Sequence, residues 1–117
     1  MPIEWIPLTD AESLDALESA SFSTPCLVFK HSTRCNISTI AKLRLEDDWD
    51  LDSGSVKAYY LDLLRYRPLS NALAERYDVH HESPQVLLLQ NGACVYDESH
   101  LGIRVEELKE ALGLTRA

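Results

Sequence analysis

The sequence has few cysteines, few basic residues and no long apolar run, and each shortage excludes a class of protein. Three cysteines, at positions 26, 35 and 94, are an odd number with wide spacing, which argues against a disulfide framework and favours reduced thiols. Acidic residues outnumber basic ones by 19 to 11, and the formal net charge of −8 disfavours nucleic acid as a partner. We therefore expect partners that are proteins or small molecules.

No apolar run approaches the roughly 18 residues that a membrane span requires. The first residues, MPIEWIPLTDAE, also lack the basic start and the apolar core of a signal peptide. We therefore expect a cytoplasmic protein that does not contact a membrane. No internal repeat, linker or low-complexity stretch divides the chain, and 117 residues with 45% apolar content suit one compact core. The sequence thus predicts a single domain over residues 1–117.

Capping signals and apolar periodicity predict four helices. Thr9 and Glu12 form a capping box before a helix over about residues 9–20, and Pro68 suits the first turn of a later helix. The apolar positions of the other two helices are Ile37, Ile40, Ala41 and Leu45 in one, and Val105, Leu108 and Leu112 in a last helix over about 104–112.

Between these helices lie runs typical of strands. Residues 26–31 form a nearly continuous apolar run, which is typical of a buried strand, and residues 56–63 and 86–90 form two more. Asn91-Gly92 then leads into a fourth run at 94–96, and this dipeptide is a strong signal for an antiparallel hairpin. The acidic run 46–52 is interpreted as a solvated loop. The predicted order is α-β-α-β-α-β-β-α.

The octet HSTRCNIS, residues 31–38, joins the first predicted strand to the second helix. Cys35 therefore falls at or near a helix N-terminus, where unpaired amides and the helix dipole favour a thiolate. Arg34, and His31 as a second candidate, would add positive charge nearby. Ser38 cannot act as a second thiol, but from one turn away its hydroxyl can donate a hydrogen bond to the thiolate. An outside thiol would then have to resolve a mixed disulfide on Cys35.

The order of elements, with a cysteine after the first strand and a proline just before the third, resembles the thioredoxin fold. The segment ERYDVHHESPQVLLLQNGA is similar to the thioredoxin stretch that runs from a helix through a cis-proline into the hairpin. This resemblance covers nearly the whole chain and implies an α/β fold with a central mixed four-stranded sheet flanked by helices. It also implies that Pro84 is cis and lies beside Cys35, with the backbone of Ser83 pairing with the substrate.

Within that superfamily, FKHSTRCNIS resembles the active-site stretch of the monothiol bacilliredoxins, the YtxJ-type proteins of the bacillithiol redox system. Their motif typically reads Thr-x-Cys-Pro-Ile-Ser, and Asn36 stands here in place of its proline. The resemblance implies a thiol–disulfide oxidoreductase that removes bacillithiol or a similar small thiol from S-thiolated client proteins. That thiol would be a co-substrate, and no bound cofactor is implied. The residues implied are Cys35, Ser38 and Arg34 for catalysis, and Thr33, Asn36, Ser83 and Pro84 for substrate binding.

Other interpretations stay open from the sequence. A cysteine at a helix start is often a packing residue, so the chain could be a non-catalytic thioredoxin-like module whose acidic surface binds a partner. Pro84 by itself could be an ordinary turn proline. An iron–sulfur carrier of the monothiol glutaredoxin type is disfavoured, because such carriers have Cys-Gly-Phe-Ser. Cys26 and Cys94 lie in strand patterns and are expected to be structural. The adjacent His80 and His81 lack the spacing of zinc ligands, so no metal is expected.

Overall fold

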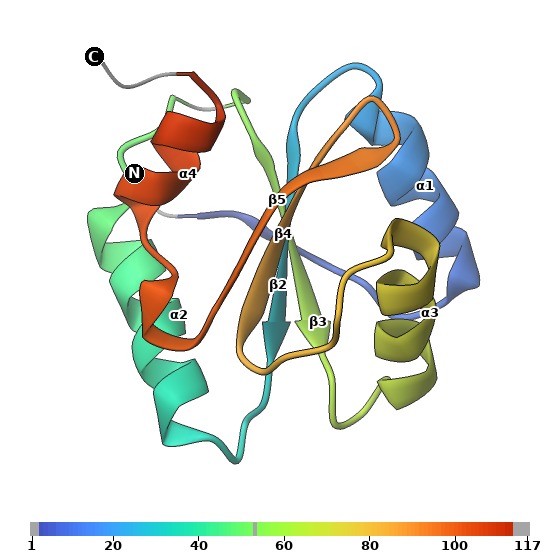
Figure 1. The fold of residues 1–117 in the computed structure, drawn as a ribbon, viewed down its shortest axis with the longest axis horizontal. Helices are drawn as coiled ribbons and strands as arrows, with labels where there is room; N and C mark the ends of the chain where they lie inside the picture. The colour runs from blue at the N-terminus through green and yellow to red at the C-terminus, as the bar shows by residue number, and fades with distance from the viewer. Residues whose placement is uncertain (1–2, 53, 114–117) are drawn as a thin grey trace.

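A five-stranded sheet lies between two pairs of helices in the computed structural model, which describes residues 3–52 and 54–113 (Figure 1). The strands are β1 (Trp5–Pro7), β2 (Cys26–His31), β3 (Lys57–Asp62), β4 (Gln85–Gln90) and β5 (Ala93–Ser99). The helices are α1 (Ala11–Ser21), α2 (Asn36–Asp48), α3 (Arg67–Tyr77) and α4 (Val105–Ala111), with a short 3₁₀ turn, η1 (His100–Gly102), before α4.

The sheet has the strand order β1-β3-β2-β4-β5 and is mixed. Strand β2 runs parallel to β3 and antiparallel to β4, so the central strand joins the parallel and antiparallel halves. The predicted hairpin is confirmed: β4 and β5 pair antiparallel across Asn91 and Gly92, whose φ angles of 54° and 78° are those of a tight two-residue turn.

The predicted four-stranded sheet is wrong by one strand, because β1 adds a fifth at the edge beside β3. Strand β1 has only three residues, pairs with one neighbour and contains Pro7. Such a short run gives no alternation of apolar and polar residues, and a proline weakens a strand prediction although it is tolerated in an edge strand.

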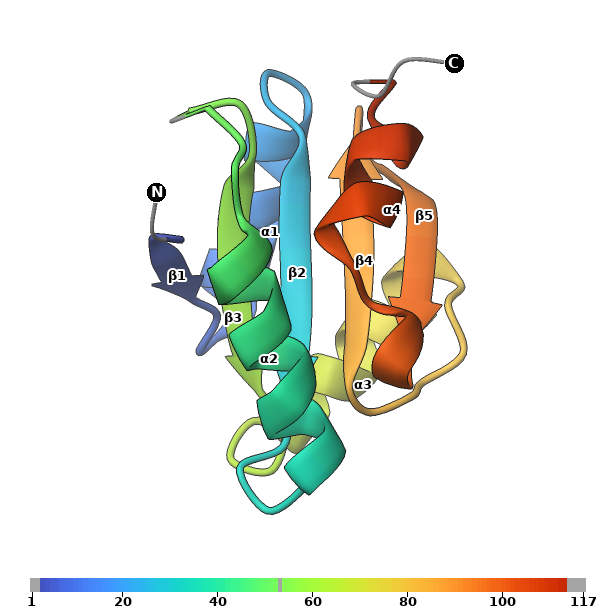
Figure 2. The ribbon, with the colours of Figure 1, turned by 90° about the vertical axis from the view of Figure 1, so that its left-hand side faces the viewer.

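Helices α1 and α3 cover one face of the sheet, and α2 and α4 cover the other (Figures 1 and 2). One face carries a buried cluster that includes Leu14, Leu17, Val28 and Leu73, and the other face carries one that includes Phe29, Ala41, Leu45 and Leu108. Strand β2 contributes to both clusters, which explains why its sequence is an almost unbroken apolar run.

Two predicted boundaries also differ from the structure. The N-cap of α1 is Asp10, which exchanges hydrogen bonds with Ser13, so the predicted capping box of Thr9 and Glu12 is wrong. The acidic run is not a loop throughout, because α2 continues to Asp48. Glu46 accepts hydrogen bonds from Lys42 at 2.7 Å and from the Trp5 indole at 2.8 Å, which hold this turn against the sheet edge.

The residues after α2 are partly core as well. Trp49 and Leu51 are buried and belong to the cluster beneath α2 and α4. The acidic side chains that alternate with them, Asp50 and Asp52, remain exposed, so successive residues of this segment face the core and the solvent in turn. In the described parts of the chain, no helix combines the length and the apolar character of a membrane span.

Candidate active site

Cys35 lies in the connection from β2 to α2. Figure 2 shows this connection at the lower end of the molecule. It is the N-cap residue of α2, with an extended backbone, and its carbonyl accepts the N–H of Thr39 at 3.1 Å. Its own N–H donates to the Ser32 carbonyl at 3.2 Å, which closes the turn after β2. Cys35 occupies the N-cap position, but among the described residues no side chain accepts a capping hydrogen bond from the first turn of α2.

The position has consequences for the chemistry of the thiol. Cys35 is partly exposed to solvent, whereas Cys26 is buried. The N–H groups of the first turn of α2 have no partners within the helix and lie at the positive end of its dipole. A thiolate at the N-cap is stabilised by both features, and the thiolate is the form that attacks disulfides.

Ser38 lies one turn into α2 and is fully buried. Its hydroxyl oxygen accepts the backbone N–H of Ser32 at 3.0 Å and is 2.6 Å from Nδ1 of His31. Among the described residues, the structure shows these two partners and no hydrogen bond from Ser38 to Cys35. The sequence interpretation therefore placed Ser38 in the correct turn but did not identify His31 as its partner.

His31 is the last residue of β2 and is buried, with 7% of its surface exposed. Its ring lies between Phe29 and Tyr60, at centroid distances of 5.9 Å and 5.6 Å. Burial lowers the pKa of His31, and the charge of Lys42 lowers it further. The neutral imidazole is therefore favoured, and His31 does not supply the positive charge that the sequence suggested.

The remaining residues of the turn are exposed. Thr33 and Arg34 lie between Ser32 and Cys35, and Asn36 is the first residue of α2. Proline is favoured at that first helical position because it needs no N–H there, so asparagine keeps the helix start but loses the preset φ of proline. In the described part of the chain, the guanidinium of Arg34 forms no ion pair and is open to solvent.

The Ser83–Pro84 peptide bond is cis, as the sequence resemblance implied. Pro84 is buried and immediately precedes β4, whose first residue, Gln85, pairs with Lys30 of β2. This register brings Pro84 level with the end of β2, where the turn to Cys35 begins. The Ser83 hydroxyl is buried and has no partner among the described residues.

The other two cysteines have different surroundings. Cys26 is buried and donates a hydrogen bond to the Thr24 carbonyl, and Cys94 is half-buried and donates one to the Tyr96 carbonyl. Burial raises the pKa of both thiols, which disfavours their thiolates. Of the cysteines, Cys35 alone lies at a helix N-terminus.

No group of three or more potential metal ligands gathers within residues 3–52 and 54–113. His81 is 3.4 Å from both the Lys30 amine and the Ser70 hydroxyl.

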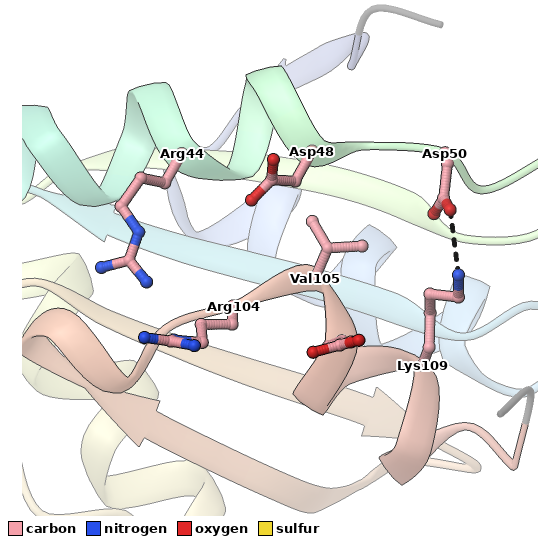
Figure 3. A pocket seen from close by; sticks show the side chains of 7 residues that line it. Arg44, Asp48, Asp50, Arg104, Val105 and Lys109 are labelled. Carbon is pink, nitrogen blue, oxygen red and sulfur yellow. Dashed lines mark hydrogen bonds and ion pairs between the residues drawn. The ribbon is translucent and has the colours of Figure 1, made fainter.

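A surface hollow of about 320 Å³ lies near the other end of α2 and is shown in Figure 3. Its charged side chains come from α2, α4 and the segments next to them, and they include the ion pair of Asp50 and Lys109. None of the predicted site residues lines it.

Comparison with known proteins identifies a family and a fold. The family model described as "Monothiol bacilliredoxin BrxC" matches residues 6–108. A solved structure described as a candidate oxidoreductase with a thioredoxin fold is 30% identical, with a TM-score of 0.79 and 92% of each chain covered.

More distant structures share the fold alone. Thioredoxin from Malassezia sympodialis is 12% identical, with a TM-score of 0.74 over 97% of this chain and 92% of that one. Thioredoxin f from spinach chloroplast is 14% identical, with a TM-score of 0.71 over 99% of this chain and 96% of that one. The thioredoxin-like α/β fold predicted from the sequence is thus confirmed, with five strands in the sheet.

Proposed function

Because the chain belongs to the monothiol bacilliredoxin family of thioredoxin-fold oxidoreductases, we propose that Cys35 is its nucleophile and that its substrates are proteins carrying a bacillithiol mixed disulfide. The observation that carries this proposal is the position of Cys35 as the N-cap of α2. That position combines partial exposure to solvent with stabilisation of a thiolate, and neither Cys26 nor Cys94 has this combination.

The reaction proceeds as two thiol–disulfide exchanges. The Cys35 thiolate attacks the bacillithiol sulfur of the mixed disulfide, a new S–S bond forms to Cys35, and the client protein leaves as a thiolate that takes a proton from water. A second low-molecular-weight thiol, as its thiolate, then attacks the bacillithiol sulfur on Cys35. The products are a small-molecule disulfide and the regenerated Cys35 thiolate.

The surroundings of Cys35 fit the use of an outside thiol. The residue one turn on is Ser38, a hydroxyl that cannot form a disulfide, and neither Cys26 nor Cys94 lies on α2. The polar side chains of Thr33, Arg34 and Asn36 are exposed around the cysteine and can contact a bound thiol. On the opposite side we assign substrate contacts to Ser83 and Pro84, at the start of β4.

The test uses a model protein loaded with bacillithiol and follows the transfer of the adduct by intact-protein mass spectrometry. We expect Cys35→Ser to abolish transfer. A variant with both Cys26→Ala and Cys94→Ala is the matched control and should react at nearly the native rate. Alanine is chosen because a hydroxyl in the buried site of Cys26 would cost stability.

A parallel reaction with a glutathione mixed disulfide tests the identity of the small thiol. We expect the bacillithiol substrate to react faster. Equal rates with both substrates would contradict bacillithiol specificity, and transfer by the Cys35→Ser variant would contradict the assignment of the nucleophile.

A further inference from the structure

Lys30 and Gln85 are buried polar residues that lie opposite each other in the sheet, where β2 pairs with β4. The Lys30 side chain contacts α3, and Gln85 is two residues before Leu87, which packs in the same buried cluster as Leu73 of α3. Among the described residues, Lys30 forms no ion pair and Oε1 of Gln85 has no hydrogen-bond partner. Burying such groups costs free energy, so packing alone does not account for this pair.

The contacts of this pair lead to one short stretch, residues 80–83, which we call the pre-proline segment. The side-chain amide of Gln85 donates a hydrogen bond to the His80 carbonyl at 2.9 Å. The Lys30 amine lies 3.4 Å from Nδ1 of the next residue, His81. Two neighbouring side chains of the sheet therefore hold two consecutive residues of the segment.

The direction of the contact between Lys30 and His81 follows from the chemistry of the two groups. An ammonium group has hydrogens to donate and no lone pair to accept with. Burial lowers the pKa of His81 and the charge of Lys30 lowers it further, so the imidazole is neutral at neutral pH. The nearby positive charge favours a lone pair on Nδ1, which then accepts the hydrogen bond. The same amine donates to the Ser70 carbonyl of α3 at 3.3 Å, so it links the segment to that helix.

The pre-proline segment ends at the cis Ser83–Pro84 bond, at the start of β4. Because β2 and β4 are antiparallel, β4 starts at the edge of the sheet where β2 leads into α2, as Figure 1 shows. The connection at this edge contains Cys35. The Pro84 carbonyl accepts the His100 N–H at 2.9 Å, so the chain is held on both sides of Ser83.

We propose that Lys30 and Gln85 are positioning residues that hold the pre-proline segment in the conformation that receives a client protein. The inference rests on the proposed function, which assigns substrate contacts to Ser83 and Pro84. Both side chains are buried, so they act through the segment and not by contact with the client. A segment that is already ordered does not have to be ordered on binding, which favours association with a protein. A small reagent that reacts with Cys35 directly does not require this order.

The first experiment measures the order of the segment in the reduced protein by NMR relaxation of its backbone amides. Lys30→Met and Gln85→Met each replace a polar side chain by an apolar one of similar length. In both variants we expect the order parameters of the Glu82 and Ser83 amides to fall from about 0.85, typical of a rigid backbone, toward about 0.6. Unchanged order parameters in both variants would overturn the proposal.

The second experiment compares a large and a small reagent for Cys35, with mass spectrometry to follow both reactions. The large reagent is a model protein loaded with bacillithiol, and the small one is iodoacetamide. We expect each variant to take the adduct from the model protein roughly fivefold more slowly, while alkylation stays within about twofold of the native rate. Equal slowing with both reagents would place the effect at the thiol and overturn the proposal, as would an unchanged rate of transfer.

The matched control is Ser21→Ala, at the other end of the sheet. Ser21 is also buried, and its hydroxyl accepts the Gly92 N–H at 2.9 Å, so it holds a different turn. This variant should react with both reagents within about twofold of the native rates, which controls for the loss of a buried hydrogen bond in general. A native protein that takes no bacillithiol from the model protein would contradict the proposed function. The order parameters would then still decide whether Lys30 and Gln85 hold the segment.

Discussion

Lys30 and His31 are neighbours at the end of β2, yet their side chains enter opposite layers of the molecule. His31 faces α2 and has a short contact of 2.6 Å with the Ser38 hydroxyl. Lys30 faces α3, where its amine donates to the Ser70 carbonyl at 3.3 Å and lies 3.4 Å from His81 Nδ1. Among the described residues, no carboxylate forms an ion pair with Lys30, although it is fully buried.

The difference shows that two buried polar residues in one strand can serve different purposes. On the His31 side, the imidazole meets the Ser38 hydroxyl in the first turn of α2, the helix whose N-cap is Cys35. The Lys30 side carries an electrostatic cost, because burial lowers the pKa of Lys30 to about 8. We therefore expect changes on the α2 face to alter thiol chemistry and changes on the α3 face to alter stability.

The substitution with the largest expected effect is Ser38→Cys, on the α2 face, and it should shorten the lifetime of a mixed disulfide on Cys35. Two thiols one helical turn apart at a helix start can reach disulfide geometry, so the new thiol should attack a mixed disulfide on Cys35 and expel the small thiol. We expect the adduct to disappear at least roughly tenfold faster without an added reductant, as an intramolecular attack allows. Time-resolved mass spectrometry of the isolated adduct measures this.

The matched control for that experiment is Thr39→Cys, which places a thiol on the next, exposed position of α2. It should leave the lifetime of the adduct close to the native value. If Ser38→Cys also retained its adduct as long as the native protein, the assumption that position 38 faces the Cys35 sulfur would fail.

Lys30→Met should stabilise the protein at pH 7. A pKa lowered from 10.5 to about 8 corresponds to a cost of at most about 3 kcal/mol for keeping the amine charged in the core. The two long hydrogen bonds that the variant loses offset part of this gain, so we expect the free energy of unfolding to rise by about 2 kcal/mol. Urea unfolding measures the change.

The exposed lysine at the other end of the paired strands, Lys57, provides the control for this experiment. Lys57→Met should change the free energy of unfolding by less than about 0.5 kcal/mol. A clear loss of stability in Lys30→Met would show that the contacts with Ser70 and His81 outweigh the cost of burial.

The smallest expected effect is the pH dependence of the difference in the free energy of unfolding between Lys30→Met and the native protein. The folded-state pKa of Lys30 lies below the unfolded value, so the unfolded chain binds more protons between about pH 8 and 10.5. The native protein therefore gains stability relative to Lys30→Met as pH rises through this window. We expect the advantage of the variant to fall by about 2 kcal/mol between pH 7 and pH 9.5, which removes nearly all of it. A constant advantage would contradict a charged, buried amine at pH 7.

Local signals were sufficient for most of the fold and for the position of the thiol. The apolar run of β2, the Asn91-Gly92 turn and the proline in the first turn of α3 all depend on neighbouring residues, and each is confirmed. The position of Cys35 between a strand and a helix follows from the same kind of signal. These features could be predicted because periodicity, turn residues and helix caps act over only a few residues.

The remaining features depend on residues that are distant in sequence. Strand β1 exists because β3 offers it an edge, and the end of α2 is held by Trp5, which is 41 residues from Glu46. Lys30 lies 51 residues from His81, and only the packing of α3 against β2 shows that its amine is buried. The amino-acid sequence by itself thus determined the elements and the candidate nucleophile. The tertiary structure decided which polar groups meet beneath that nucleophile, because burial and hydrogen-bond geometry are set by the packing of whole elements and not by local pattern.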